Sequence, residues 1–596
     1  MNLHLVLIET SGNQQYIFAT NKLRENVGAS ELTYRVGTEW VLDAVEAVSG
    51  KKIWADNSQQ LRENLCNSDL NPLITRDGVE VEVIIATSGK ALLLVKKSEV
   101  ARKIVRQVTM KALEFAPGID VCGVISNRFD WNDKSLGEVN EEIHKRFEEV
   151  RTSRPGPALR FLRLPVVTEC KSSGLPASKW HDVDEKDAAA RSVVNIRKWE
   201  NREAYENRMQ KLPGLSEMKV NFAKNVGKLE ADCDWLAVIH ADGNGLGEIF
   251  LKFGKHAGCQ PDPPVSDYRQ LNETHVDKFR RFSLALDVCT EKAFLSSLEK
   301  LLERDVDVWF KLPILPLVLG GDDLTIVCDG KAALQFTEHF LTEFEKETEV
   351  AVDICQIAKV ALGAPRLSAC AGIAIVKPHF PFSAAYDLAE ELIKSAKQVK
   401  RIVIKPKNQE SLPDEPWPCS AIDFHALYDS TASELEEIRG RKVEGEFRGK
   451  LVLDGGKTKL YARPYVVTDL DTLQKDKPKG LEWAESHHWR ELEGRINAIL
   501  QSDEADTERR ALPNSQLHDL RAGLFLGKDV ANDRYQLISH RYEKANLKNF
   551  EEKDGGIFFE DSDSRKNQFN ATKLLDAMDA ANFWVKEPSR NGGSAK

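Results

Sequence analysis

Two adjacent carboxylates carry the clearest chemical signal in this sequence. Asp322 and Asp323 follow Gly320 and Gly321 and separate two apolar runs, 315–319 and 324–327. We interpret the runs as a β-hairpin with the two glycines at its turn, because a two-residue turn requires positive φ. Paired carboxylates at the tip of an apolar hairpin need a cation, and their hard oxygen atoms suit Mg²⁺ or Mn²⁺. The alternative is a solvated turn, where Gly and Asp are common.

A third carboxylate, Asp242, ends another apolar strand, Trp235–His240 with Ala241. In a ferredoxin-like sheet this strand lies beside the central hairpin, so Asp242 is expected to approach the hairpin tip. Carboxylates around two metal ions form a phosphoryl-transfer site. The glycine-rich residues that follow can present backbone N–H groups to a triphosphate. The alternative is a glycine-rich loop with a capping Asp.

Neighbouring side chains on a strand point to opposite faces, so only one aspartate of the pair is expected to face Asp242. We favour Asp322 as the direct ligand and keep Asp323 as a site member. Lys397 lies in a later predicted helix, where it can reach phosphates or belong to a solvated basic face. Ser283 can contact a base or ribose, or bond back to its own helix.

The predicted site therefore has three groups of residues. The catalytic residues are Asp242, Asp322 and Asp323, and the metal site is Asp242, Gly243, Asp322 and Asp323. The predicted nucleotide-binding residues are Asn244, Gly245, Leu246, Gly247, Ser283, Gly320, Gly321 and Lys397.

The elements that must position these residues occur twice in the same order: strand, helix, hairpin, helix, strand. In the first copy they are a strand at Leu3–Ile8, helices from about Gln14 and at Ser30–Val48, a hairpin at Val79–Lys96, a helix at Glu99–Phe115 and a strand at Val121–Ser126. In the second copy they are Trp235–His240, Phe279–Glu303, the Asp322 hairpin, Lys331–Glu347, Leu367–Val376 and Ser383–Arg401. This repetition predicts an α+β fold with two copies of a four-stranded antiparallel unit. The first copy has Thr87-Ser88-Gly89-Lys90 at the hairpin tip and lacks the carboxylate pair.

Composition narrows the function classes. The 596 residues are 42% hydrophobic and carry a net charge of −10, which disfavours broad non-specific duplex binding. The ten cysteines form no C-x-x-C pair, which argues against a disulfide framework and a cysteine-rich zinc site. The sequence contains no Walker A motif or dinucleotide fingerprint. Without a signal peptide or membrane span, a cytoplasmic location is expected.

The motifs together resemble the polymerase-like large subunit of type III CRISPR effector complexes. The resemblance is carried by the GGDD hairpin, by HADGNGLG at 240–247 and by AGIAIVKPHFPFSAAYDLAEELIKSAK at 371–397. Near the N-terminus, the matching residues are Gln14 or Gln15, Ile17, Lys22, Arg24, Ser30 and Leu32. The likeness spans about residues 1–430, and the family has two palm domains of which the first is usually degenerate.

The resemblance implies four segments. They are a degenerate N-terminal palm at 1–139, a helical linker at 140–232, a catalytic palm at 233–429 and a mainly helical accessory domain at 430–596. The charged run Asp184–Lys211 in the linker is interpreted as a solvated helix face. The accessory domain is expected to include a hairpin at Lys450–Tyr461 and helical stretches at Trp483–Leu500 and Ser515–Glu543. Its last residues, Glu587–Lys596, are expected to be disordered.

The resemblance also implies synthesis of cyclic or linear oligonucleotide messengers from ATP in antiviral defence. Asp242, Asp322 and Asp323 would hold two Mg²⁺ or Mn²⁺ ions, and the first palm would hold a second nucleotide. With no HD nuclease segment ahead of the first palm and no cysteine-rich element between the palms, we expect a stand-alone or minimal relative that does not cleave DNA. Expected partners are another NTP, RNA, CRISPR complex subunits or further copies of this chain. The alternatives are a non-catalytic scaffold subunit and a GGDEF-like cyclase that uses GTP.

Overall fold

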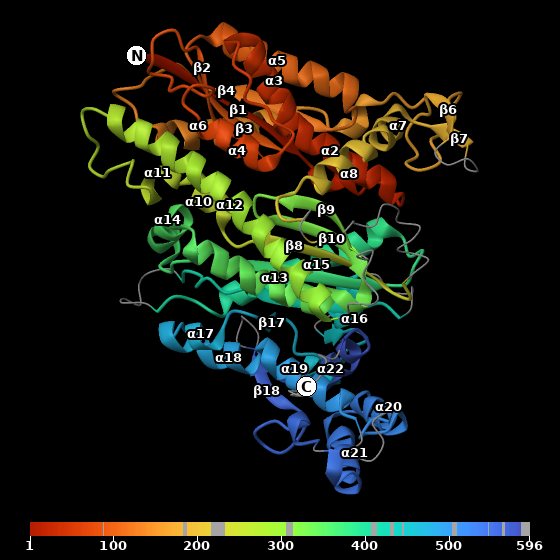
Figure 1. Ribbon diagram of the computed structural model, residues 1–596. Coiled ribbons are helices and arrows are strands. Elements are labelled where there is room, and N and C mark those ends of the chain that lie inside the picture. The colour runs from red at the N-terminus through yellow and green to blue at the C-terminus, as the bar shows by residue number, and fades with distance from the viewer. Residues whose placement is uncertain are drawn as a thin grey trace, which may run out of the picture.

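The computed structural model describes residues 1–87, 89–182, 188–215, 218, 233–304, 314–406, 414–428, 434–443, 446–502, 509–545, 547–562 and 567–585. The N-terminal sheet lies at the top of Figure 1, the second sheet in the middle and the C-terminal helices at the bottom. The predicted disorder of Glu587–Lys596 lies outside the described residues, as does Ser88 of the first hairpin turn.

The first copy forms an antiparallel sheet with the strand order β2-β3-β1-β4, and β5 adds to β1. Its elements are β1 (Asn2–Ser11), α1 (Asn13–Ile17), α2 (Leu23–Gly37), α3 (Glu39–Ser49), α4 (Ser58–Cys66), β2 (Val81–Thr87), β3 (Lys90–Val95), α5 (Ser98–Phe115), β4 (Asp120–Ile125) and β5 (Phe129–Asp130). Successive residues Leu5 to Ile8 are all fully buried, so both faces of β1 are covered. The predicted helix Ser30–Val48 is wrong as a single element. It is α2 and α3, separated at Thr38, whose φ and ψ are not helical.

The second copy forms a larger sheet with the order β17-β12-β11-β8-β10-β9. Its elements are β8 (Leu236–Gly243), α10 (Leu246–Leu251), α11 (Phe253–His256), α12 (Arg269–Arg304), β9 (Ile314–Gly320), β10 (Asp323–Asp329), α13 (Gly330–Val350), α14 (Val352–Leu362), β11 (Ala369–Val376), α15 (Phe382–Ala396), η2 (Lys397–Arg401) and β12 (Ala421–Ala426). The four strands β9, β10, β8 and β11 pair antiparallel, whereas β12 runs parallel to β11. The edge strand β17 (Tyr465–Val466) follows residue 429, so the C-terminal segment contributes to this sheet.

Strand registers confirm the duplicated fold. Glu9 on β1 lies opposite Lys90 on one side and Cys122 on the other. Asp242 on β8 likewise lies opposite Cys370, and the β8–β10 register places Asp323 on its other side. Each first strand is followed by a helix whose N-cap is a left-handed glycine, Gly12 before α1 and Gly245 before α10. Glu9 therefore corresponds to Asp242, and Lys90 to Asp323.

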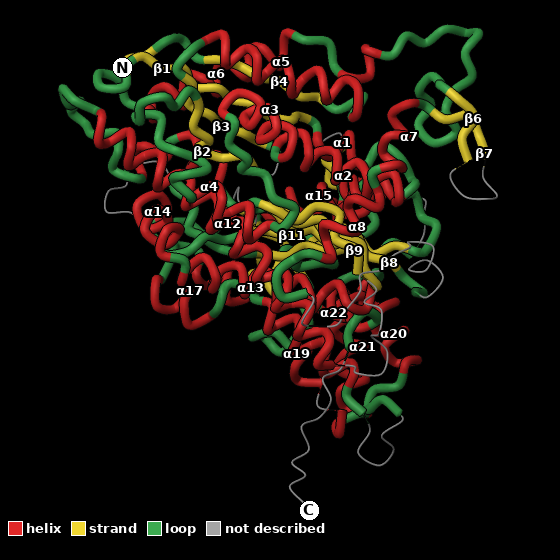
Figure 2. Tube along the Cα trace, turned by 45° about the horizontal axis from the view of Figure 1, so that its top comes forward, coloured by secondary structure: helices red, strands yellow, loops and turns green. Residues whose placement is uncertain are grey.

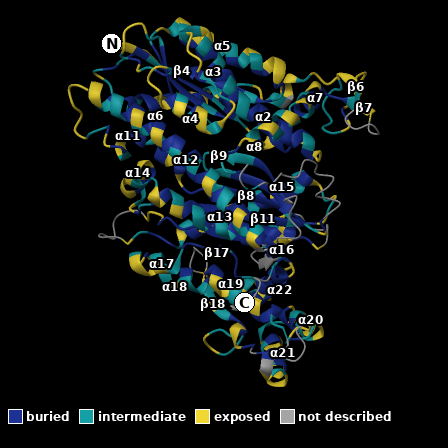
Figure 3. Cartoon of the chain, viewed as in Figure 1, coloured by how far each residue is buried: buried dark blue, intermediate teal, exposed yellow. Residues whose placement is uncertain are grey.

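Helix α12 lies between the two sheets. It packs against α13 and α14 of its own copy and also contacts β2 of the first copy and β9 of the second. Figure 1 shows this helix crossing between the upper and middle parts of the molecule, and Figure 3 shows that the strands on either side are largely buried. The position of the second hairpin therefore depends on a helix that both copies share.

The linker segment contains α6 (Leu136–Ser153), η1 (Pro157–Arg160), β6 (Lys179–Asp182), β7 (Ala188–Arg191), α7 (Val193–Glu200) and α8 (Arg202–Gln210). The predicted solvated face at Asp184–Lys211 is wrong for its helices, because α7 and α8 pack on α2. Lys198 is only 1% exposed and donates to the carbonyl of Tyr16. Arg208 ion-pairs with the buried Glu31. Charged residues of this run therefore bind α7 and α8 to the first copy.

The C-terminal segment is helical with small sheets, as predicted. Its elements are α16 (Leu435–Arg439), β13 (Arg441–Val443), β14 (Glu446–Arg448), β15 (Val452–Leu453), η3 (Asp454–Gly456), β16 (Thr458–Lys459), β17, α17 (Leu470–Asp476), α18 (Leu481–Ser486), α19 (Trp489–Leu500), α20 (Asn514–Leu524), α21 (Lys528–Arg541), η4 (Glu543–Ala545), η5 (Leu547–Phe550), β18 (Phe559–Ser562), β19 (Gln568–Ala571) and α22 (Leu574–Ala581). Among the described helices, none is both long enough and apolar enough to cross a membrane.

Candidate functional site

Three carboxylates meet where β8 ends and the β9–β10 hairpin turns. One ligand oxygen from each of Asp242, Asp322 and Asp323 lies within 4.8 Å of the others. Asp323 opens β10 and pairs with Gly320, so the two turn residues are Gly321 and Asp322. The turn thus lies one residue later than predicted. Because Asp322 is in the turn, strand alternation does not direct it away, and both aspartates approach Asp242.

The turn depends on two glycines that allow close packing. Gly321 has a φ of 61°, in the left-handed region that glycine adopts without strain. Gly243 lies directly beside Asp322, and a Cβ atom there would come within 2.8 Å of the Asp322 carboxylate. The Gly243 N–H also donates to that carboxylate. Gly243 therefore orients Asp322 through its backbone and its missing side chain.

Their surroundings make Asp322 and Asp323 harder to ionise when no cation is present. Burial raises the pKa of Asp322, the Gly243 N–H opposes the rise, and the nearby Asp287 adds to it. Burial raises the pKa of Asp323 as well, and the charge of Asp322 adds to the effect. A divalent cation would remove this repulsion, and three convergent carboxylates are the oxygen donors that Mg²⁺ and Mn²⁺ prefer. The donor set therefore fits the predicted metal.

Lys397 reaches the same carboxylates from η2. Its Nζ forms an ion pair with Asp242 Oδ2. Burial lowers the pKa of Lys397 to about 8, and the neighbouring Lys400 adds to the decrease. The structure thus brings Lys397 to the site, although its partner is a carboxylate at the position where we predicted phosphate contact.

The glycine-rich loop after Asp242 is held from inside the protein. The Asn244 N–H donates to the Ser368 carbonyl at 2.8 Å, and its side-chain amide donates to Ser368 Oγ and the Cys419 carbonyl. Asn244 therefore braces the loop, and its side chain is 6% exposed. Open space lies beside Gly245 and Gly247. Of the backbone N–H groups that we predicted to bind an anion, those at the start of α10 therefore remain.

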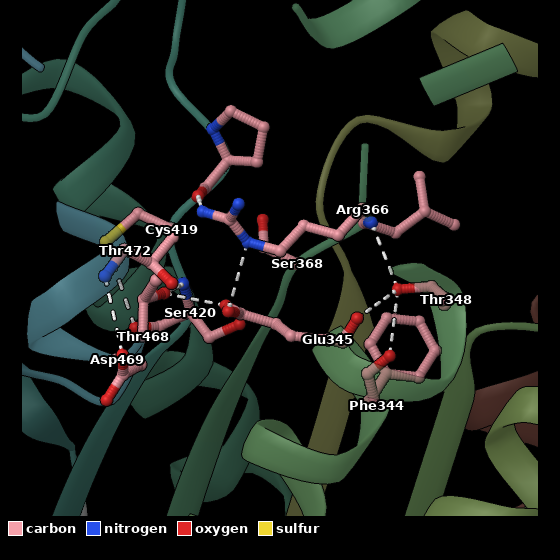
Figure 4. Close-up of polar contacts among 12 residues, drawn as sticks. Phe344, Glu345, Thr348, Arg366, Ser368, Cys419, Ser420, Thr468, Asp469 and Thr472 are labelled. Atoms are coloured by element: carbon pink, nitrogen blue, oxygen red, sulfur yellow. Dashed lines mark hydrogen bonds and ion pairs between the residues drawn. The ribbon is translucent and has the colours of Figure 1, made fainter. Parts of the chain in front are cut away.

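A buried network fixes the residues that hold Asn244. Figure 4 shows Arg366 against Glu345, with Nε and Oε2 separated by 3.3 Å, and Thr468 donating to Glu345 Oε1 at 2.6 Å. Thr468 in turn accepts the Ser420 N–H at 2.7 Å. Because Thr468 follows β17, the C-terminal segment helps to fix the loop beside Asp242.

The site opens into a cavity of about 140 Å³ between the two copies. Asp323, Gly320 and His240 line it from the second sheet, and Gln14, Tyr34 and Arg62 line it from the first copy. Figure 2 shows α1, α2 and α8 near β8 and β9, and α2 contacts β9 directly. Ser30 on α2 donates to the Leu317 carbonyl, so the first copy also contacts the hairpin that carries Asp322 and Asp323.

His240 has no partner at metal-ligand spacing in the sequence, so no local pattern marks it as a site residue. The structure places it in the cavity wall, with Nδ1 3.1 Å from Thr325 Oγ1 and Nε2 3.4 Å from Gln14 Nε2. Burial, followed by the charge of Lys397, lowers its pKa to about 4, so the ring is neutral near pH 7. These partners come from distant segments, which no local pattern reveals.

The hydroxyl of Ser283 is used within its own helix. It donates to the Phe279 carbonyl at 2.9 Å and is 5% exposed. This is the helix back-bond considered as the alternative to nucleotide contact. On α12, the residues that line the cavity are Asp287 and Glu291, one and two turns further along.

Comparisons with known proteins agree with this geometry. Residues 235–404 match the family model described as Cas10/Cmr2, second palm domain. The model covers β8, the hairpin, β11, α15 and Lys397. It therefore favours Cas10/Cmr2 over the GGDEF-type cyclases. No curated protein matches the chain significantly.

Several solved structures are similar at low identity. Csm1 from T. onnurineus is 13% identical with a TM-score of 0.44, over 92% of this chain and 65% of that one. A type III-B Cmr-beta structure in the apo state is 10% identical with a TM-score of 0.45, over 91% and 77%. A Csm1–Csm4 cassette in complex with cA4 is 14% identical with a TM-score of 0.34, over 70% and 56%. The chain thus spans about two thirds or less of the Csm1 chains that it matches. Residues 235–404 are therefore similar to the second palm domain of Cas10/Cmr2, and this match confirms the resemblance to the polymerase-like large subunit of type III CRISPR complexes.

Proposed function

We propose that this protein is a metal-dependent nucleotidyltransferase that joins ATP into cyclic or linear oligonucleotides in CRISPR type III-like defence. The observation that carries the proposal is the convergence of Asp242, Asp322 and Asp323 at the end of a Cas10/Cmr2-type palm sheet. Three carboxylates brought this close together repel one another, which destabilises a protein that has no cation to bind, so a scaffold has no use for them.

Each part of the site has a distinct task in this proposal. The three aspartates hold Mg²⁺ or Mn²⁺, which would polarise the α-phosphate and acidify the attacking hydroxyl. Lys397 neutralises Asp242 until substrate binds and then provides a positive charge for phosphate oxygens. The N–H groups at the start of α10 add further donors.

The first palm supplies the opposite wall of the cavity. It contributes polar side chains from α1, α2 and α4, including Gln14, Tyr34 and Arg62. We propose that a second nucleotide binds against this wall, with its hydroxyl directed to the metal site. The protein would act with RNA, with other CRISPR complex subunits or as a homo-oligomer.

The direct test is incubation of the purified protein with each NTP separately and with Mg²⁺ or Mn²⁺, followed by mass spectrometry. The Asp322→Asn/Asp323→Asn variant removes both charges while retaining side-chain shape. Asp277→Asn, an exposed position on α12, is the matched control. An oligoadenylate made by the wild type and the control, but not by the double variant, supports the proposal.

A wild-type protein that binds neither metal nor nucleotide would contradict the proposal and favour the scaffold alternative. Because an RNA or protein activator is expected, the incubation is repeated with the complex purified from the native host. Absence of product from both preparations, with metal and nucleotide bound, would also contradict catalysis.

A further inference from the structure

We infer that Asp287 and Thr290 on α12 are positioning residues that hold the GGDD turn in its metal-binding form. The inference rests on the proposed metal site and adds two residues from a helix that carries none of the carboxylate ligands. It begins with the backbone of Gly321, the residue directly before Asp322.

Both polar backbone groups of Gly321 bond to side chains of α12. The Gly321 N–H donates to Asp287 Oδ1 at 2.5 Å. Thr290 Oγ1 donates to the Gly321 carbonyl at 2.6 Å. Asp287 and Thr290 are three residues apart, so they share one face of the helix and bind the two peptide groups on either side of the Gly321 Cα atom.

These bonds replace pairing that the hairpin cannot supply. Strand β9 ends at Gly320 and β10 begins at Asp323, so Gly321 lies outside the β-ladder. Glycine at a φ of 61° has many alternative conformations, and an unrestrained turn would let the Asp322 carboxylate move away from Asp242. Thr290 is fully buried and Asp287 is 9% exposed, so both bonds are shielded from water.

The helix that carries this clamp is itself fixed to the first palm. Glu291, adjacent to Thr290, forms a bidentate ion pair with Arg62 of α4, with N–O distances of 2.9 Å. Earlier on the helix, the buried Arg280 pairs with Glu82 of β2 at 2.7 Å. The position of α12, and with it the metal-binding turn, therefore depends on the first palm.

Metal affinity measured without substrate tests this inference. Mn²⁺ binding to the full chain is followed by electron paramagnetic resonance for the wild type, Asp287→Ala, Asp287→Asn and Thr290→Val. Loss of a partner that orients metal ligands typically weakens affinity by about 10- to 100-fold. We expect that loss for Asp287→Ala and a smaller one for Thr290→Val, whereas Asp287→Asn retains an acceptor oxygen and restores most of the affinity.

A matched control separates the clamp from general helix stability. Thr337 on α13 is also fully buried and donates to its own helix, at the Ala333 carbonyl 2.7 Å away. Thr337→Val should change stability about as much as Thr290→Val but leave Mn²⁺ affinity unchanged. Circular dichroism and thermal unfolding establish that each variant is folded.

The outcomes distinguish this inference from the proposed function. If the wild type binds Mn²⁺ and both Asp287→Ala and Thr290→Val bind it equally well, the clamp is wrong and the metal site stands. If Asp287→Asn loses as much affinity as Asp287→Ala, the charge matters rather than the hydrogen bond, and the clamp is again wrong. If the wild type binds no Mn²⁺, both the inference and the proposed metal site fail.

Discussion

The two palms of this chain have sheets of the same topology but carry different charges at the hairpin tip. In the second palm, Asp242 and Asp323 lie on adjacent strands with Asp322 beside them. In the first palm, the corresponding residues are Glu9 and Lys90, whose side chains form an ion pair of 3.2 Å. The lysine of the first tip balances its single carboxylate, whereas in the second tip three carboxylates share one lysine, Lys397, and negative charge is left in surplus. The first palm thus has a lysine at the position that corresponds to Asp323 in the second palm.

The second difference lies directly after these carboxylates. Thr10 follows Glu9, whereas Gly243 follows Asp242. Thr10 Oγ1 donates to the Gly89 carbonyl at 3.1 Å, so this side chain closes the first hairpin tip. Gly243 leaves that space for the Asp322 carboxylate. The arrangement of carboxylates in the second palm thus depends on the missing side chain of Gly243 as well as on the acids themselves.

The largest effect on product formation is expected when Asp323 of the second palm is replaced by lysine, the residue at the corresponding position of the first palm. In Asp323→Lys, the ammonium group would pair with Asp242 and displace the metal, as Lys90 pairs with Glu9. Metal ions contribute several kcal/mol to such a transition state, so product formation should fall by at least about 100-fold. Mass spectrometry of the ATP reaction measures this loss, with Asp277→Lys as an exposed control. Retained activity in Asp323→Lys would show that Asp323 is not a ligand.

Closing the gap at Gly243 should be the next largest effect. In Gly243→Ala, the new Cβ would lie 2.3 Å from Leu246 Cδ1 and 2.8 Å from the Asp322 carboxylate. Overpacking of this kind costs about 1–3 kcal/mol, and displacement of Asp322 should weaken metal binding as well. Chemical denaturation and Mn²⁺ titration measure the two effects.

The control for Gly243→Ala is Gly494→Ala on α19, where open space surrounds the new methyl group. Alanine is favoured over glycine inside a helix by up to about 1 kcal/mol, so this variant should be slightly stabilised. Equal behaviour of the two variants would refute the packing argument.

The surplus charge predicts a pH dependence that arises at the tip of the second palm. Folding raises the pKa of Asp322 and Asp323, so the folded chain binds more protons than the unfolded chain at pH values above the ordinary carboxyl pKa. The free energy of unfolding of the metal-free protein should therefore fall as pH rises from about 4 to neutrality. Bound Mg²⁺ requires ionised carboxylates, so its stabilising effect should grow over the same range.

Thermal unfolding at several pH values, with and without Mg²⁺, measures this dependence. The Asp322→Asn/Asp323→Asn variant should lose the part of this decrease that the two carboxyl groups cause, and it should lose the response to Mg²⁺. A Mg²⁺ response that stays constant with pH would contradict the raised pKa of these carboxyl groups.

Removing the internal cation of the first palm should have the smallest effect. The Glu9–Lys90 pair is partly exposed, so Lys90→Met should cost about 1 kcal/mol or less. Lys90 Nζ also lies 2.8 Å from His144 Nε2. Burial, then Lys90, lowers the pKa of His144 to about 4, so the variant should raise that pKa. Nuclear magnetic resonance titration measures it, and an unchanged value would show that Lys90 has no influence.

Local sequence patterns predicted the parts of the site that are formed by residues close together in the chain. Apolar runs and glycines located β8, the hairpin and the duplication, because strand length and turn chemistry are local properties. The turn was misplaced by one residue, since pairing of Asp323 with Gly320 is decided by the neighbouring strand. The bracing role of Asn244 could not be predicted, because its partners, Ser368 and Cys419, lie more than 120 residues away.

Other residues could not be predicted because tertiary packing decides their role. Lys198 belongs to a charged run typical of a solvated helix, yet it is buried against the first palm. Asp287 is one of many acids on a long helix and gains importance only through Gly321. The fold class and the three aspartates were therefore accessible from the sequence, whereas the residues that orient them were not.

The second palm should bind the metal ions, whereas the first palm should not. Anomalous X-ray scattering from crystals soaked in Mn²⁺ and a non-hydrolysable ATP analogue tests this difference most directly. We expect anomalous peaks among Asp242, Asp322 and Asp323 and none between Glu9 and Lys90. A peak at Glu9, or none at the three aspartates while the analogue is bound, would contradict it.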